Sequence, residues 1–93
     1  MKMETARVTN PQGLHARSAA TIVKLATLFQ SSIELKNGAK VANAKNIMAL
    51  LLLEASKGPQ LTVRTNGMDE AQALAQMIRL IEDNFGETST PSP

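Results

Sequence analysis

The turn signal Asn37-Gly38 limits the folds open to this chain more than any other part of its sequence. Apolar and polar side chains alternate over residues 32–36 before this turn, and residues 40–43 form a second extended run after it. Asn-Gly between two such runs is the strongest short-range signal for a β-hairpin. Because strands joined by a tight turn run antiparallel, the sheet of this protein must contain antiparallel neighbours.

The rest of the chain shows the periodicities of two further strands and three helices. Asn46 and Asp69 are suitable N-cap residues, and Gln72 follows Asp69 in the register of a capping box. The expected strands cover about residues 3–9, 32–36, 40–43 and 61–65, and the expected helices cover about residues 16–28, 47–53 and 70–85.

Each of the two long helices has one apolar stripe that can pack on a sheet. The stripes consist of Ala19, Ile22, Val23, Ala26 and Phe29 in the first helix and of Ala71, Leu74, Ile78, Ile81 and Phe85 in the last. The order β-α-β-β-α-β-α therefore predicts an α+β fold. It is a two-layer open-faced sandwich in which three helices cover one side of a four-stranded antiparallel sheet.

The composition is that of one small soluble domain, which we expect to span residues 1–86, followed by a disordered polar tail over residues 87–93. The chain has no cysteine, which excludes disulfides, thiolate zinc sites and thiol catalysis. Ten basic and eight acidic residues give a net charge of +2, too balanced for a strong nucleic-acid footprint. With no signal peptide and no membrane-spanning run, we expect a cytoplasmic monomer without metal or cofactor.

His15, the single histidine, lies in Gly13-Leu14-His15-Ala16-Arg17, directly before the first expected helix, and we expect it to be the N-cap. Backbone N–H groups in a first helical turn have no partner within the helix, and the peptide dipoles add partial positive charge there. A phosphoryl group on the His15 ring would meet the N–H groups of Ala16, Arg17 and Ser18 and the guanidinium of Arg17. The sequence therefore predicts a phosphoryl-binding site built on a nucleophile.

This arrangement resembles the histidine-containing phosphocarrier protein (HPr) family of the bacterial phosphoenolpyruvate-dependent phosphotransferase system. The resemblance covers about residues 3–85. It rests on Gly13-Leu14-His15-Ala16-Arg17 and on Lys45-Asn46-Ile47-Met48-Ala49-Leu50 at the family's spacing, with Lys57-Gly58 and Gly67 also matching. Both the sugar-system carrier and its nitrogen-related paralogue fit, and the apolar run from Ile47 to Leu53 favours the nitrogen branch.

The resemblance implies a phosphoryl carrier rather than an enzyme. His15 would accept a phosphoryl group on Nδ1 from phosphorylated enzyme I and pass it to an enzyme II A domain, for sugar uptake or nitrogen-linked regulation, while Arg17 contacts the group. Two residues depart from the family pattern. Ser18 stands where most members have proline, and Asn46 stands where many sugar-system members have a regulatory serine that a kinase phosphorylates. We expect that kinase control to be missing at position 46.

A partner's active site must reach His15, so we expect docking on the exposed neighbours of this residue. The outer side of the first helix and the apolar residues of the second offer such a surface: Ala20, Lys24, Thr27, Ile47, Met48 and Leu51. Leu50 and Leu53 can be buried, and the alternative is a larger core that takes in the other apolar residues of the second helix. Four lysines are expected to be solvated charges: Lys24, Lys40, Lys45 and Lys57.

Two other functions stay open at this point. A small RNA-binding module fits the sandwich pattern and the positive net charge. It requires stacking aromatics on the sheet, however, and Phe29 and Phe85 both lie on expected core stripes. A regulatory homologue that is never phosphorylated would bind the same partners, but it would have no need of a nucleophile at His15.

Overall fold

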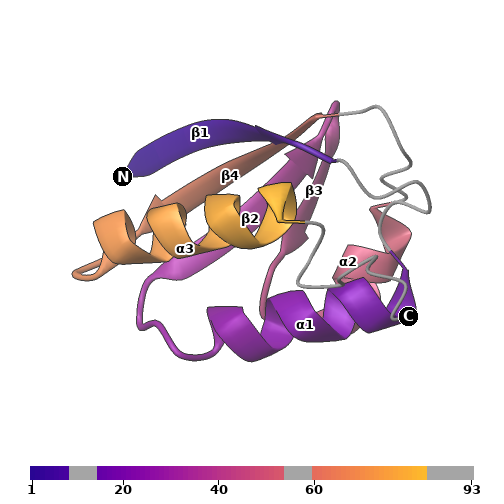
Figure 1. Ribbon diagram of the computed structural model, residues 1–93, viewed down its shortest axis with the longest axis horizontal. Helices are drawn as coiled ribbons and strands as arrows, with labels where there is room; N and C mark the ends of the chain where they lie inside the picture. The colour runs from indigo at the N-terminus through magenta and orange to yellow at the C-terminus, as the bar shows by residue number, and fades with distance from the viewer. Residues whose placement is uncertain (9–14, 54–59, 84–93) are drawn as a thin grey trace, which may run out of the picture.

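The computed structural model describes residues 1–8, 15–53 and 60–83 of the chain (Figure 1). The predicted order of four strands and three helices is confirmed. The elements are β1 (Lys2–Arg7), α1 (Ala16–Ala26), β2 (Ser32–Asn37), β3 (Lys40–Asn43), α2 (Ile47–Leu52), β4 (Gln60–Asn66) and α3 (Glu70–Glu82). Differences from the expected bounds are small: β1 begins one residue earlier and ends two residues earlier, and α1, α2 and α3 end two, one and three residues earlier. The expected disordered tail lies outside the described residues.

The four strands form one antiparallel sheet with the order β1-β4-β2-β3. The predicted hairpin joins β2 to β3, but its central residues are Gly38 and Ala39, because Asn37 pairs with Lys40 as the last residue of its strand. Gly38 has a φ of +63°, a left-handed conformation that favours glycine. Asn37 instead uses its side chain, whose Nδ2 donates to the carbonyl oxygen of Leu53 at 3.0 Å.

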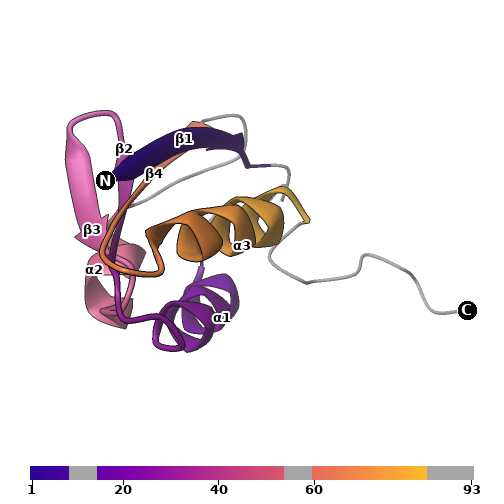
Figure 2. The ribbon, with the colours of Figure 1, turned by 90° about the vertical axis from the view of Figure 1, so that its left-hand side faces the viewer.

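All three helices lie on the same face of the sheet, as the view in Figure 2 shows. Helix α3 packs against β1, β4 and β2, and helix α2 packs against β3. Helix α1 packs against both other helices and completes the helical layer (Figure 1). The structure is thus the predicted α+β open-faced sandwich.

The core lies between the two layers and consists of aliphatic side chains. Ile33, Leu35, Leu61 and Val63 point inward from the sheet and are fully buried. The helical layer meets them with buried side chains of similar size: Ile22, Leu50, Met77 and Ile81. Burial of each large aliphatic side chain contributes about 1.5–3 kcal/mol, so this layer contact is the main source of stability.

The apolar stripe of α1 is confirmed, whereas the predicted stripe of α3 is partly wrong. Ala71 is exposed, and the buried residues of α3 are Ala73, Leu74, Met77, Ile78 and Ile81. The side of α3 that faces the sheet therefore includes Ala73 and Met77, which the predicted stripe left out, and excludes Ala71. Met77 belongs to that side because its flexible side chain fills the space above the sheet. Phe85, the last residue of the expected stripe, lies outside the described residues.

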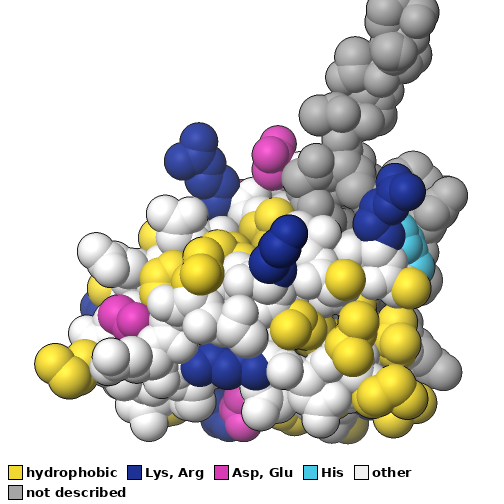
Figure 3. Space-filling view, turned by 90° about the horizontal axis from the view of Figure 1, so that it is seen from below, with side chains coloured by type: hydrophobic (Ala, Val, Ile, Leu, Met, Phe, Trp, Pro, Cys, Tyr) yellow, Lys and Arg dark blue, Asp and Glu magenta, His cyan; other side chains and the backbone are white. Residues whose placement is uncertain are grey.

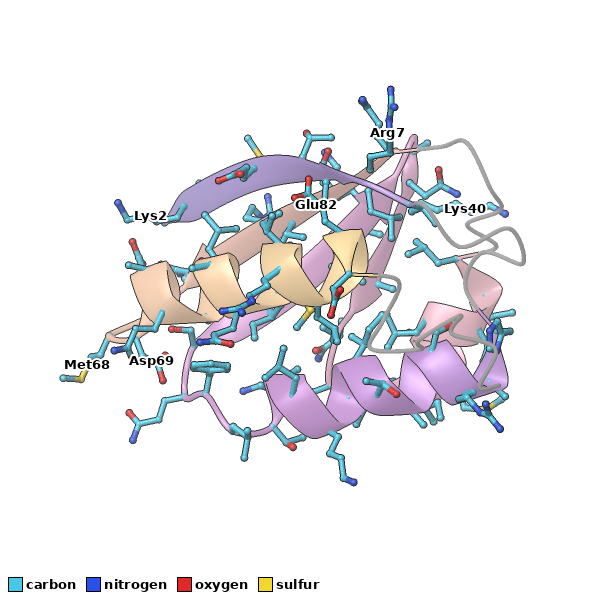
Figure 4. All side chains as sticks on the ribbon, in the orientation of Figure 1. Lys2, Arg7, Lys40, Met68, Asp69 and Glu82 are labelled. Carbon is cyan, nitrogen blue, oxygen red and sulfur yellow. The ribbon has the colours of Figure 1, made fainter. Side chains whose placement is uncertain are left out.

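Asp69 occupies the predicted N-cap position of α3, but the predicted capping box with Gln72 is wrong. The Asp69 carboxylate accepts from the backbone N–H groups of Gln30 and Ser31, each at 2.9 Å, and from the Ser31 hydroxyl. It thereby fastens the segment between α1 and β2 to the start of α3, and Figure 4 shows Asp69 directed at that segment. Gly67 allows this contact, because a Cβ there would lie 2.5 Å from Oγ of Ser31.

This contact makes stability depend on pH. The hydrogen bonds from the Ser31 hydroxyl and the Gln30 N–H hold the pKa of the Asp69 carboxyl below its ordinary value. A carboxyl whose pKa is lowered by folding stabilises the protein above its unfolded-state pKa of about 4, and this contribution is lost as the pH falls through the lower pKa of the folded state.

We therefore expect Asp69→Asn to lower the free energy of unfolding at pH 7, with the gap to the parent protein narrowing as the pH falls below about 4. Urea unfolding over a pH series measures both quantities. Asp83→Asn, at the C-cap of the same helix, is the matched control and should give no such narrowing. A gap for Asp69→Asn that is constant with pH would contradict the assignment.

Candidate functional site

Helix α1 begins directly after His15, which is its N-cap as predicted, with extended φ and ψ angles of −136° and −176°. Ser18 fixes this start. Its hydroxyl accepts from the backbone N–H of His15 at 2.9 Å and donates to the carbonyl oxygen of His15 at 3.1 Å. The side chain of His15 faces the backbone N–H of Ser18 in return, which completes a capping-box arrangement. The histidine ring is therefore held over the N-terminus of the helix.

The two ring nitrogens of His15 lie in different surroundings. Nε2 is buried. Nδ1 takes the place that a carboxylate or amide oxygen of Asp or Asn has in an ordinary N-cap, and so it is the ring nitrogen beside the N–H groups of the first turn. A group attached to Nδ1 would consequently lie where the helix dipole and the N–H groups favour negative charge.

The first turn supplies the other groups expected at this site. Ala16 and Arg17 are exposed, whereas Ser18 is fully buried. The Ser18 hydroxyl is occupied by the cap, and the backbone N–H of Ser18 faces the His15 ring, so an anion attached to that ring would lie beside this N–H. Serine thus replaces the family's proline without loss of the helix start, because its side chain supplies the cap that fixes the first turn.

Arg17 is a cation without an acidic partner in the described part of the chain, where the ion pairs are Met1 with Glu70 and Arg64 with Glu34. A cation near a helix N-terminus destabilises the helix by about 0.3–1 kcal/mol. Figure 3 shows a cationic side chain directly beside the histidine, at the end of the molecule where α1 begins. The site is thus positively charged and open to solvent on one side.

An apolar surface adjoins the histidine, and Figure 3 shows its side chains gathered at the same end of the molecule. It consists of residues from α2 that point away from the core. Met48 is 65% exposed, and Ile47 and Leu51 are 38% and 37% exposed. Leu50 and Leu53 are buried as predicted. The alternative of a larger core is wrong, because Ile47, Met48 and Leu51 are exposed. Ala20 and Lys24 on α1 and Thr27 at its C-cap are exposed as predicted, and Lys24 also lines a groove between α1 and α3.

Two contacts hold α2 in this position. Asn46 is the predicted N-cap, and its side-chain oxygen accepts from the backbone N–H groups of Met48 and Ala49. Such a cap contributes about 1 kcal/mol. Lys45 is half-buried, and its Nζ donates to the carbonyl oxygen of Phe29 at 2.8 Å, just beyond the end of α1. The expectation that Lys45 is a solvated charge is therefore wrong.

Lys45 is the site-shaping residue that the sequence did not reveal. A lysine beside an N-cap asparagine has no local signal for a partner that lies 16 residues earlier in the chain. Its ammonium group makes a charge-assisted hydrogen bond to the Phe29 carbonyl oxygen, in the segment that follows α1. The contact sets the position of α2 relative to α1, and hence the shape of the surface that the two helices share.

The described residues contain neither a metal-binding cluster nor a membrane-spanning helix. No three histidine or acidic side chains among them lie close enough together to hold a metal ion. None of the helices they form has the length and apolar character needed to cross a bilayer. The described strands also carry no aromatic side chain, so the sheet lacks the stacking surface that the RNA-binding alternative requires.

Comparison with known proteins shows the family of this chain. A sequence model described as "PTS HPr component phosphorylation site" matches residues 2–83. The phosphocarrier protein HPr of Xylella fastidiosa is 42% identical over 80 residues, which are 86% of this chain and 90% of that protein. The phosphocarrier protein NPr of Klebsiella oxytoca is 35% identical over 85 residues, covering 90% and 94% of the two chains.

A solved structure shows the same similarity in three dimensions. The crystal structure of HPr from Thermoanaerobacter tengcongensis superimposes with a TM-score of 0.88 at 40% identity and covers 95% of this chain and 99% of that one. The family match covers all seven helices and strands and includes His15 and the exposed residues of α1 and α2. This chain belongs to the HPr family and is a phosphoryl carrier of the phosphotransferase system.

Proposed function

We propose that His15 carries the phosphoryl group on Nδ1, that it receives the group from phosphorylated enzyme I, and that it passes the group to an enzyme II A domain. The observation that carries this proposal is the position of His15 as N-cap of α1, with Nε2 buried and Nδ1 beside the first-turn N–H groups. A buried nitrogen is out of reach of a partner's phosphoryl group, which supports Nδ1 as the attacking atom.

The transfer exchanges one bond at phosphorus for another. The lone pair of Nδ1 forms the new N–P bond, while the bond from phosphorus to the donor group of enzyme I breaks and its electron pair leaves with the donor. The ring proton stays on Nε2. Backbone N–H groups of Ala16, Arg17 and Ser18 then donate to the phosphoryl oxygens, and the guanidinium of Arg17 adds charge-assisted hydrogen bonds.

The reverse exchange delivers the group to the next protein. Nothing in the proposed site makes a second covalent bond to phosphorus, so an enzyme II A nucleophile can take the group from Nδ1 by the same displacement. The protein thus acts as a carrier rather than as an enzyme that converts a substrate. We propose that it does so as a cytoplasmic monomer, in sugar uptake or in nitrogen-linked regulation.

His15 should be the sole phosphoryl acceptor, because it is the only imidazole in the chain. Incubation with phosphoenolpyruvate and enzyme I should add one phosphoryl group, measured by intact mass at alkaline pH. The product should be stable in base and lost in acid, as expected for a phosphoramidate. His15→Ala should accept no label, and residual labelling of this variant would refute the assignment.

Arg17 should act on transfer rather than on folding, because its side chain is exposed and lacks an acidic partner among the described residues. Arg17→Ala should change the free energy of unfolding by about 0.5 kcal/mol or less. It should remove roughly 2–4 kcal/mol of transition-state stabilisation from phosphoryl transfer. Arg17→Lys should recover only part of this loss, because a point charge cannot replace the planar fork.

Rapid-quench transfer from phosphorylated enzyme I, together with urea unfolding, separates these two quantities. Arg7→Ala is the matched control, since Arg7 is an exposed arginine on β1 that points away from the helical layer (Figure 4). Equal transfer rates for the parent protein and Arg17→Ala would exclude a role for this guanidinium.

We also propose that partners dock on the α1–α2 surface formed by Ala20, Lys24, Thr27, Ile47, Met48 and Leu51. Met48 is the most exposed large apolar residue of this set, so Met48→Asp should place an unpaired charge in the centre of the interface without disturbing the core. The dissociation constant for enzyme I should rise by about tenfold or more.

Amide chemical shifts recorded during a titration with enzyme I measure this constant and map the surface. Met68→Asp is the control, because Met68 is 95% exposed and lies at the far end of the molecule, beside Asp69 (Figure 4). Shifts centred on the open face of the sheet, with the surroundings of Met48 unchanged, would place the interface elsewhere.

A further inference from the structure

A groove of about 370 Å³ runs between α1 and α3, outside the proposed phosphoryl site, and it shares Lys24 with the proposed docking surface. Its apolar lining comes from Leu25 on α1, from Leu28 just beyond the end of α1, and from Leu80 on α3. Leu25 and Leu80 are half-buried against the core, whereas Leu28 is 75% exposed. A large aliphatic side chain so exposed beside a groove leaves apolar surface that an apolar ligand can cover.

Each wall of the groove also carries a cation. Lys24 projects from α1 and Arg79 from α3, and both side chains line the groove. Neither of them forms an ion pair with a carboxylate in the part of the chain that the structure describes. Two cations from different helices that converge on one apolar groove match the negatively charged head of an amphipathic molecule.

The third charged residue of the groove, Asp83, gives it a direction. Helices α1 and α3 run in opposite directions (Figure 1), so Asp83 near the end of α3 faces the Thr21 part of α1 rather than the Leu28 part. An anionic head placed between the two cations would be repelled by Asp83 at one end. Its hydrocarbon chain would therefore extend the other way, towards Leu28.

We propose that this groove binds a small amphipathic carboxylate, with the carboxylate between Lys24 and Arg79 and the hydrocarbon chain over Leu25, Leu80 and Leu28. The volume lies within the range of about 300–1,000 Å³ that is typical of small-molecule sites, and the lining has their usual character of apolar side chains with a few polar groups. The acidic end at Asp83 favours a single negative charge over a phosphate dianion.

Octanoate is the probe for this site. Titration of the ¹⁵N-labelled protein should shift the amides of residues 21–28 and 76–83 in a saturable way. The uncharged 1-octanol and the cationic octylammonium ion share its chain length, and both should bind more weakly. Arg79→Gln and Leu28→Ser should each weaken octanoate binding by about fivefold, whereas Asp83→Asn should strengthen it.

The controls are variants with the same chemical change elsewhere. Lys36→Gln removes a cation from β2, and Leu52→Ser removes a leucine that is 71% exposed on α2. Both should bind octanoate like the parent protein. Absence of saturable shifts, equal affinity for the three probes, or equal weakening by the control variants would overturn the proposal. Unchanged amide spectra away from each substitution establish that the variants are folded.

Discussion

The reciprocal contact between Ser18 and His15 is the interaction on which the proposed phosphoryl site depends. A helix that begins one residue earlier or later would turn the histidine ring away from the first-turn N–H groups. The Ser18 hydroxyl prevents this, because it binds both backbone polar groups of His15 at once. Ser18 is fully buried, so water does not compete for its hydroxyl. The sheet and the other helices serve as the rigid support from which α1 presents this end.

The second helix contributes to the same end by a different means. Six residues are too few for a helix to be stable alone, so α2 depends on its N-cap and on its neighbours. Asn46 satisfies the N–H groups at its start, Leu50 and Leu53 anchor one side, and Lys45 ties the start to the end of α1. The opposite side can therefore remain apolar and exposed without loss of the fold. An exposed apolar surface beside a reactive group is what a carrier that meets several partners requires.

The features that could be predicted from the sequence are those set by neighbouring residues. The hairpin at Gly38, the N-caps His15 and Asn46 and the stripe of α1 all depend on residues within a few positions, and all are confirmed. Asp69 and Lys45 were misjudged because their partners lie 38 and 16 residues away, a distance at which local patterns carry no information. The order β1-β4-β2-β3 likewise follows from packing between distant segments.

The cap at Ser18 has a consequence for the proposed cycle as a whole. A negative group on Nδ1 complements the positive end of α1, whereas the free ring leaves the dipole of this helix without an anion. The phosphorylated and the free form of the carrier would then differ in the stability of the first turn of α1. The phosphoryl group would slow hydrogen exchange at the amides of residues 16–18, so that these few amides report, without any label on the partner, how much of the protein is loaded.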